Sequence, residues 1–467
     1  YQNIRGSVEE GAEELFYTNQ MIIAAWGSSA SSATVRAPEQ AFKPWKDLYP
    51  YTEKDIEELV NRKVKGQDIL LFSLLKKDRF LDIIQNFIVF EDKGNSKVKM
   101  ACRYQQYRAV QKAIKKIENA ERLEDRNGTI WHTQGSGKSL TMLFLALKLR
   151  RLKSIGNPTI LIVTDRVDLD KQISGTFKKC GFPNPKRAKS VNDLKELLSS
   201  KAGRTIMTTI HKFQEYENEK YPLLSKKKDI FVMADEAHRT QFKDLAANMR
   251  IALPNACYIG FTGTPIDKES KSTLRTFGDY IDTYTIEQSV DDKATLPIKY
   301  ESRLVDLHIE DKTLDEIFDQ TFHKYTDEEK KKIKTKYATE NDIAEAKYRI
   351  KAIALDIIKH YREKTYPFKA QIVAVSRLAA VRYKDAIDEL DGPETAVIYS
   401  SGHNDDGLLK KYAIDKSQKS HIVERFKDPE DSLKIIIVCD MLLTGFDAPV
   451  EQVMYLDKSL KEHNLLQ

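Results

Sequence analysis

Residues 129–140 read TIWHTQGSGKSL and place glycines, a lysine and a serine in the order that a phosphate-binding loop requires. A short apolar run leads into GSGKS at residues 135–139, and an apolar helix pattern begins at Leu140. Glycines in such a turn let backbone N–H groups face an anion, and the helix adds the positive end of its dipole. Lys138 can reach terminal phosphates, and Ser139 can place its hydroxyl on Mg²⁺. The segment therefore predicts binding of a nucleoside triphosphate.

One position departs from the full pattern, because His132 stands where the pattern has glycine. We interpret the segment as a variant of the phosphate loop; the alternative is a Gly/Ser turn before an ordinary core helix. The predicted nucleotide contacts form one continuous run, which comprises His132, Thr133, Gln134, Gly135, Ser136, Gly137, Lys138 and Ser139.

Two further polar segments follow apolar runs directly. Residues 230–234 lead into DEAH at 235–238, and residues 257–261 lead into TGTP at 262–265, which contains Thr264. In a parallel sheet the loops at the carboxyl ends of the strands form the ligand site, so both segments fall where a ligand is held. The alternative for DEAH is a charged helix cap.

These segments require a sheet to position them. Five runs are continuously apolar or β-branched, as expected for strands buried on both faces, and helical stretches separate them. The runs are residues 129–131, 160–163, 205–209, 230–234 and 257–261. A second series comprises residues 371–375, 396–399, 434–439 and 453–456. We predict an α/β fold with two doubly wound parallel sheets.

The remaining chain is less informative. Residues 1–95 predict a mostly helical lead-in with helical spacing at 53–60 and 68–81 and a loop at 30–37. The E-x-K at residues 91–93 is half of a nuclease pattern, and a solvated turn is the favoured interpretation. Pro297 predicts a hinge, and residues 325–351 predict exposed charged helices. The predicted domains are 1–95, 96–295 and 296–467, the last with a charged insertion at about 305–350.

Composition sets outer bounds. The 467 residues are 41% hydrophobic and carry a net charge of +6, which is compatible with a polyanionic partner. No apolar run is long enough to span a bilayer, and the four cysteines are scattered without a C-x-x-C, which argues against zinc and against a secreted disulfide framework. A reduced cytoplasm is the expected compartment. Because residue 1 is tyrosine, we expect a fragment of a longer chain.

The segment RYQQYRA at residues 103–109 precedes a basic helix pattern. An amide can donate and accept at once, which matches the edge of adenine, so Gln106 is a candidate base reader, with Arg103 beside it. An exposed helical glutamine is the alternative.

GSGKS, DEAH and TGTP in this order resemble the first motor domain of a superfamily 2 helicase or translocase. The resemblance implies two RecA-like domains, ATP and Mg²⁺ as cofactors, Asp235 as a metal ligand with Ser139, and Glu236 as the residue that activates water. Lys138, Asp235 and Glu236 become the predicted catalytic set. TGFD at residues 444–447 resembles a later motor motif and implies that Gly445 and Asp447 touch the nucleotide. The arginines of the sixth motif are not in the sequence, so we expect them outside this fragment.

Longer strings narrow the family. WHTQGSGKSLTM, VTDRVDLDKQ, DEAHRTQF, LPIKYESRL and CDMLLTGFDAP together resemble the motor (R) subunit of type I restriction enzymes over residues 80–467. The resemblance implies an ATP-driven translocase on double-stranded DNA, in complex with methyltransferase and specificity subunits and acting before endonucleolytic cleavage. No complete nuclease set is found, so we expect most of that domain to be missing. Alternatives are a superfamily 2 helicase or remodeller outside restriction and an ATP-binding module that does not hydrolyse.

A motor that steps along any sequence grips phosphates rather than base edges. Candidate side chains for this grip are Arg166, Thr209, His211 and Arg377. Each has the alternative of a satisfied surface residue.

Overall fold

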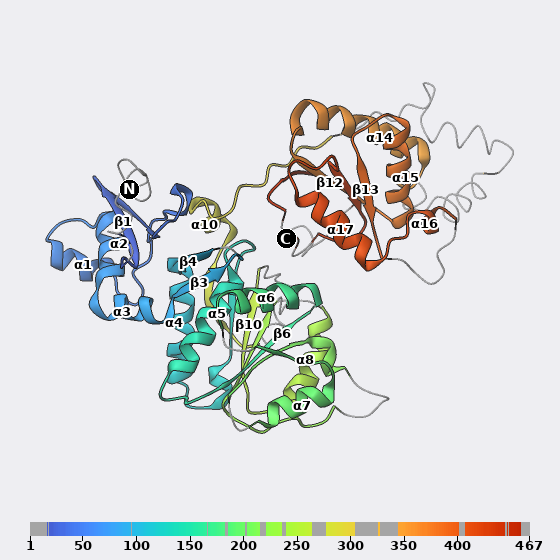
Figure 1. The fold of residues 1–467 in the computed structure, drawn as a ribbon. Helices are drawn as coiled ribbons and strands as arrows, with labels where there is room; N and C mark the ends of the chain where they lie inside the picture. Colours follow the sequence, from blue (N-terminus) through green and yellow to red (C-terminus); the bar gives the residue numbers. More distant parts are fainter. Residues whose placement is uncertain are drawn as a thin grey trace. The chain divides into compact units, whose positions relative to one another are not determined.

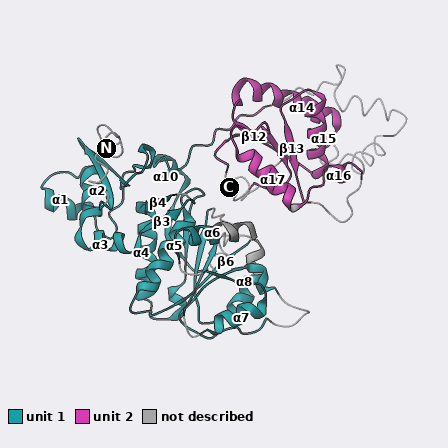
Figure 2. Ribbon diagram, in the orientation of Figure 1, with its two compact units in different colours: residues 1–298 teal, residues 299–467 magenta. Residues whose placement is uncertain are grey.

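The computed structural model describes residues 16, 18–94, 96–165, 167–182, 185–200, 203–214, 221–235, 240–263, 277–303, 326, 344–400, 407–443, 446 and 448–458. The chain forms two compact units, residues 1–298 and 299–467, which Figure 2 shows in separate colours.

The first unit is built on a seven-stranded sheet of order β11-β5-β10-β9-β6-β8-β7, with every neighbouring pair parallel. Parallel pairing needs a crossover between strands, and the helices that follow the strands supply it (Figure 1). The strands are β5 (Gly128–His132), β6 (Thr159–Thr164), β7 (Lys186–Arg187), β8 (Thr205–Thr209), β9 (Ile230–Asp235), β10 (Cys257–Thr262) and β11 (Tyr280–Tyr284). The helices are α4 (Tyr104–Glu118), α5 (Lys138–Arg151), α6 (Val167–Lys179), α7 (Val191–Ser199), α8 (Thr240–Ala252) and α10 (Ile286–Asp291).

Both faces of this sheet are buried, as the continuous apolar runs predict. Along β6, Ile160 and Ile162 join the core cluster that contains side chains of α4 and α5. Leu161 and Val163 join the cluster that contains side chains of α7 and α8. Successive side chains of a strand point to opposite faces, so a strand covered on both sides must be apolar throughout. The predicted parallel α/β fold is confirmed, and each of the five predicted runs lies within an observed strand.

Among the described residues before α4, the first unit has three α-helices and two hairpins. The helices are α1 (Glu53–Val60), α2 (Gly66–Leu75) and α3 (Lys77–Asn86). The hairpins pair β1 (Met21–Trp26) with β2 (Ser29–Thr34), and β3 (Ile88–Asp92) with β4 (Lys97–Ala101).

The prediction of a loop at residues 30–37 was wrong, because β2 occupies most of that stretch. Its alanines and its serine at position 31 are buried, and the preceding Ser28 carbonyl accepts a hydrogen bond from the Gln67 N–H at the start of α2 (3.0 Å). Small side chains let a helix approach the strand closely. A pattern search that looks for large apolar residues therefore misses such a strand.

The second unit has a four-stranded parallel sheet of order β13-β14-β12-β15. Its strands are β12 (Lys369–Ala374), β13 (Thr395–Ile398), β14 (Ile435–Val438) and β15 (Glu451–Asp457). Its helices are α14 (Lys347–His360), α15 (Arg377–Glu389), α16 (Gly407–Lys411) and α17 (Lys416–Lys427). Ile435 and Ile437 enter one core cluster, while Ile436 and Val438 enter another, so this sheet is also covered on both faces. The second predicted sheet is confirmed.

Within the described ranges, no helix combines the length and the apolar character that crossing a bilayer requires.

Candidate nucleotide site

The segment 133–137 connects β5 to α5 and contains two glycines in the left-handed region. Gly135 has φ +77° and Gly137 has φ +88°. A side chain at either position would strain the backbone, so the sequence uses glycine where the turn needs it. Gly137 is the N-cap of α5, and the first turn of a helix leaves its N–H groups without intrahelical acceptors. The result is a turn with the backbone shape of an anion cradle.

Lys138 lies over the end of the neighbouring strand. A Cβ atom added to Gly263, the residue directly after β10, would stand 2.8 Å from the Lys138 Nζ atom. β10 lies between β5 and β9, and Phe261 of β10 is in register with Asp235, the last residue of β9. The lysine, the glycine and the buried Asp235 therefore lie at the carboxyl ends of neighbouring strands of the sheet. The next acidic residue, Glu236, lies outside the described residues, as does Thr264.

Gln106 contacts the phosphate loop directly. Its Nε2 donates to the Gly137 carbonyl oxygen (3.2 Å), and its Oε1 accepts from the backbone N–H of Arg103 (2.9 Å). Gln106 is therefore not the exposed helical glutamine that was its alternative, since only 3% of it is exposed. Arg103 is the N-cap of α4, so both residues of the predicted base-reading segment sit beside the loop. Base reading itself stays a prediction.

A cavity of about 1250 Å³ opens beside the loop, within the first unit. Gly135, Ser136 and Gly137 form part of its wall, and Arg103 with Gln106 forms another part. The hydroxyl of Ser136 is buried and has no hydrogen-bond partner among the described residues. A buried hydroxyl without a partner is costly, so a ligand that accepts or donates there would relieve the cost.

The cavity is strongly basic. Among the described residues that line it, the only acid is Asp292, against a set of cations comprising Arg36, Lys43, Lys93, Lys97, Lys99 and Arg103. Burial, together with the charges of Arg103 and Lys293, lowers the pKa of Lys43. Burial alone would raise the pKa of Asp292, but hydrogen bonds from Lys46, Tyr104 and Tyr284 hold it below its ordinary value. A wall with this balance suits a polyanion such as a triphosphate.

His132 is fully buried, and its ring pairs with a residue of β11 rather than with the phosphate loop. Its Nε2 lies 2.9 Å from an Asp282 carboxylate oxygen on β11. Burial lowers the pKa of His132, and the nearby Arg108 and Lys138 charges act in the same direction, although hydrogen bonding to Asp282 opposes them. The histidine that replaces the first glycine of the pattern is therefore a packed, paired residue, and only its backbone remains beside the predicted phosphate site.

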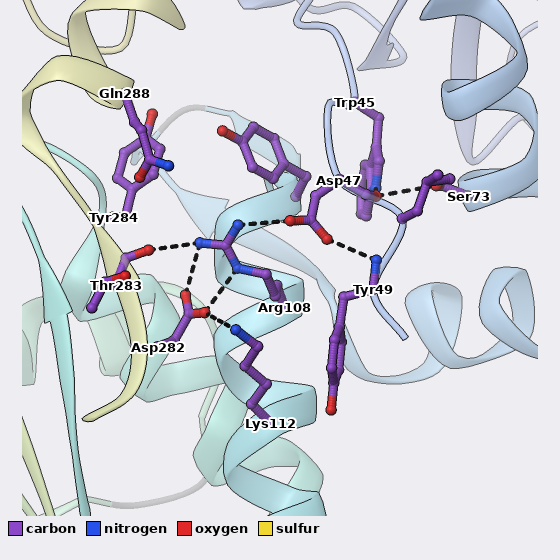
Figure 3. A network of polar contacts seen from close by, with 12 residues as sticks. Trp45, Asp47, Tyr49, Ser73, Arg108, Lys112, Asp282, Thr283, Tyr284 and Gln288 are labelled. Atoms are coloured by element: carbon purple, nitrogen blue, oxygen red, sulfur yellow. Dashed lines mark hydrogen bonds and ion pairs between the residues drawn. The ribbon is translucent and has the colours of Figure 1, made fainter. Parts of the chain in front are cut away.

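Figure 3 shows the cluster that holds Asp282, which the sequence did not reveal. Arg108 of α4 donates to both carboxylate oxygens of Asp282 (2.8 and 3.0 Å) and also to Asp47 (2.7 Å). Lys112, one turn along α4, donates to Asp282 as well (2.8 Å). No local pattern could have found these pairs, because Arg108 and Asp282 are separated by 174 positions in the chain.

The residues fit Mg²⁺ held jointly with phosphate oxygens. In the described part of the chain, no group of three or more His, Cys, Asp or Glu side chains could hold a metal alone. Mg²⁺ in nucleotide sites keeps several waters and takes one or two protein oxygens plus phosphate oxygens. The Ser139 hydroxyl at the start of α5 and the Asp235 carboxylate at the end of β9 are of the right chemical kind.

The candidate DNA contacts are distributed over both units. Thr209 is the last residue of β8 and lies at the same carboxyl end of the sheet as Asp235. His211 lies two residues further along the chain and is exposed. In the second unit, Arg377 begins α15 and donates to the Ser400 carbonyl oxygen (3.1 Å). The fourth DNA candidate, Arg166, lies outside the described residues, as do Gly445 and Asp447, which were predicted to touch the nucleotide.

The E-x-K pattern is an ordinary strand end. Lys93 pairs with Glu91 at 3.6 Å, and both side chains face solvent to some extent. Asp92 accepts from the Gly94 N–H in the hairpin turn (2.8 Å). The favoured interpretation of a solvated turn agrees with these contacts.

Comparisons with known proteins bear on the whole chain. Residues 105–331 match the model of the SWI2/SNF2 ATPase family, and residues 300–467 match the family described as type I restriction enzyme subunit R domain 3. The HindI type I restriction enzyme endonuclease subunit of Haemophilus influenzae is 34% identical over 97% of this chain. A candidate endonuclease subunit, MjaIXP of Methanocaldococcus jannaschii, has the same identity and coverage.

The chain is a homologue of the R subunits of type I restriction enzymes. The predicted resemblance is thereby confirmed. This R-subunit homologue spans 45% of the length of each of the two relatives, which is about half of such a subunit. A solved fragment of a candidate HsdR subunit from Vibrio vulnificus YJ016 shares the fold, with a TM-score of 0.51 over 97% of this chain and 86% of that chain at 15% identity.

Proposed function

We propose that this R-subunit homologue binds ATP with Mg²⁺ at the phosphate loop and hydrolyses it to move double-stranded DNA as the motor of a type I restriction-modification complex, before endonucleolytic cleavage. The observation that carries the proposal is the position of the Lys138 Nζ atom against Gly263, beside the strand that ends at Asp235. An ammonium over the end of β10 and a carboxylate at the end of the adjacent β9, next to a glycine turn, are parts that phosphoryl transfer requires.

The chain's own residues would act mainly by position. The N–H groups of Gly135 to Ser139 would cradle phosphate oxygens, and Lys138 would place its charge on the terminal phosphates. Ser139 and Asp235 would hold Mg²⁺, which would neutralise charge that develops on the transferred phosphoryl group. Glu236, the next residue along the chain, would orient the attacking water and accept its proton. Gln106 and Arg103 would contact the base from the cavity wall.

We infer the DNA partner from the proposed activity, translocation, rather than from a contact of a particular residue. A translocase must hold any sequence, so it grips the backbone through charges, hydroxyls and N–H groups. Thr209, His211, Arg166 and Arg377 remain the candidates for this grip. The relatives' names describe endonuclease subunits of restriction enzymes. We therefore extend the proposal to a complex with methyltransferase and specificity subunits.

The proposal is tested in the full-length protein by Lys138→Ala. We expect DNA-stimulated ATP hydrolysis to fall to background while the thermal unfolding temperature stays near that of the wild type. Lys153→Ala is the matched control, because Lys153 is an exposed lysine just beyond the other end of α5. Its turnover should equal that of the wild type. Unchanged hydrolysis in Lys138→Ala would refute the assignment.

The same experiment separates the alternatives. A wild-type protein that binds ATP but does not hydrolyse it, with or without DNA, would favour the ATP-binding module. Hydrolysis that DNA stimulates without the methyltransferase and specificity subunits, and that those subunits leave unchanged, would favour a helicase or remodeller outside restriction.

A further inference from the structure

Asp47, in the segment between β2 and α1, reaches the first motor sheet through a single arginine. Arg108 Nη1 donates to the Asp47 carboxylate (2.7 Å), and the other nitrogens of the same guanidinium donate to Asp282 (Figure 3). The Arg108 side chain is 12% exposed and that of Asp282 is 1% exposed. A planar guanidinium has fixed donor directions, so two carboxylates on one arginine constrain each other's positions.

Asp282 accepts from three different side chains at once. Arg108 and Lys112 of α4 approach it from one helix, and the His132 ring approaches its second oxygen from β5. Although burial raises the pKa of Asp282, hydrogen bonds from His132 and Arg108 lower it to about 2. An ionised carboxylate only accepts, so we assign the proton of the neutral imidazole to Nε2. The buried Nδ1 has no partner among the described residues.

His132 is the last residue of β5, immediately before the phosphate loop. The next residue, Thr133, donates its N–H to the Tyr284 carbonyl oxygen on β11 (3.0 Å), so β11 borders the loop's beginning. The loop's other end is held by Gln106, which donates to the Gly137 carbonyl oxygen. Gln106 and Arg108 belong to the same helix, α4. One helix therefore holds both ends of the loop, directly at Gly137 and through Asp282 at His132.

The segment that contains Asp47 is fixed to the same region by further contacts. Lys46 forms an ion pair with Asp292 (2.5 Å), and Lys43 donates to the Lys293 carbonyl oxygen (3.3 Å). Lys43 and Asp292 also line the cavity beside the loop. This segment is thus part of the cavity wall and is joined to the residue that orients His132.

We propose that Asp47, Arg108, Asp282 and His132 form a positioning relay through which the N-terminal part of the chain sets the geometry of the phosphate loop and hence its affinity for a nucleoside triphosphate. The inference rests on the proposed nucleotide binding. Arg108 and Asp282 are positioning residues in this relay, since neither touches the predicted phosphate position. Asp47 is the member of the relay that belongs to the N-terminal lead-in, residues 1–95.

The test is Asp47→Asn in the full-length protein, with affinity for a non-hydrolysable ATP analogue and Mg²⁺ measured by calorimetry. We expect affinity to fall by about fivefold or more, the lower end of typical coupling between two sites. Asp82→Asn is the matched control. Asp82 of α3 pairs with Lys148 of α5 (2.7 Å) and accepts from Gln111 of α4, so it also joins the lead-in to the motor sheet. Among the described residues, its hydrogen-bond partners do not include Arg108, Asp282 or His132. Its affinity should change by less than about twofold.

A double variant distinguishes a relay from a general structural effect. If the relay exists, Asp47→Asn has little further effect on affinity once Asp282→Asn is present, because the connection is already broken. If Asp282→Asn does not fold, Arg108→Lys takes its place. Lysine keeps the charge but cannot span both carboxylates, so Arg108→Lys should lower the affinity for the ATP analogue as Asp47→Asn does. Equal affinities for Asp47→Asn and Asp82→Asn would overturn the relay. Full affinity in Lys138→Ala would instead overturn the proposed function.

Discussion

Substituting Gly263 by alanine probes the contact between the end of β10 and the lysine of the phosphate loop. The new Cβ would stand 2.8 Å from Lys138 Nζ, whereas ordinary contacts begin at 3.4 Å. The other neighbours are the Gln134 N at 3.4 Å and the His132 carbonyl oxygen at 3.8 Å, which are ordinary contacts. Gly263 is not in the left-handed region, so the change adds no backbone strain. The substitution therefore acts on the lysine.

The expected size follows from this geometry. To restore an ordinary contact, the ammonium has to move by about 0.6 Å from its 2.8 Å position. A 1 Å misplacement near the chemistry costs about 10²-fold in rate, so 0.6 Å corresponds to about tenfold in kcat/KM, or about 1.4 kcal/mol of transition-state stabilisation. Because Nζ is the far end of a flexible side chain, the free energy of unfolding should change by less than about 1 kcal/mol.

The assay is steady-state ATP hydrolysis with saturating double-stranded DNA, paired with urea unfolding of the same preparations. Gly175→Ala is the matched control. Gly175 lies inside α6, is not left-handed, and its added Cβ would meet nothing within 4 Å. Its stability should rise by about 0.5–1 kcal/mol with unchanged turnover. If Gly263→Ala matched the wild type in kcat/KM, the lysine would not need this position, and the reasoning from the strand order would be refuted.

Two further predictions concern the loop and its histidine. Gly137→Ala places a Cβ 2.5 Å from Gln106 Nε2 at a residue with φ +88°, so the affinity for an ATP analogue should fall by the equivalent of about 1–2 kcal/mol. Gly156→Ala, left-handed at +78° but in open space, should lose stability only, and equal affinities in both variants would contradict the contact with Gln106. Burial lowers the pKa of His132 in the fold, so the unfolded chain binds more protons and wild-type stability should fall as pH drops below about 6.5, by up to about 1.4 kcal/mol per pH unit. Urea unfolding at pH 7.5 and 5.5 should show this loss of stability in the wild type and not in His132→Gln. Equal losses in both proteins would contradict a neutral buried histidine. Asp282, whose pKa is about 2, stays ionised throughout this range.

The sheets were predictable because their strands carry a strong local signal. Strands covered on both faces carry apolar or β-branched residues at consecutive positions, and β6, β8, β9 and β10 follow this rule over most of their length. The glycines at 135 and 137 were predictable for a similar reason, since only glycine adopts their backbone angles without strain.

Other features depend on contacts between distant parts of the chain, and no sequence pattern encodes them. β2 is built from small residues whose burial depends on α2. β11 was missed because this outermost strand of the sheet has exposed positions and carries the buried charge of Asp282. The environment of His132 was unpredictable, because Asp282 lies 150 positions away. The sequence showed that His132 departs from the loop pattern, and the structure shows that its partner is Asp282.

The most direct test of the central claim is an experimental structure of the full-length protein with Mg²⁺ and a non-hydrolysable ATP analogue. We expect the terminal phosphates to lie on the N–H groups of Gly135 to Ser139, with the Lys138 ammonium within about 3.2 Å of a phosphate oxygen. Asp235 should contact Mg²⁺ directly or through one of its waters. An analogue bound elsewhere, with Lys138 still resting on Gly263 and Asp235 remote from the metal, would contradict the account.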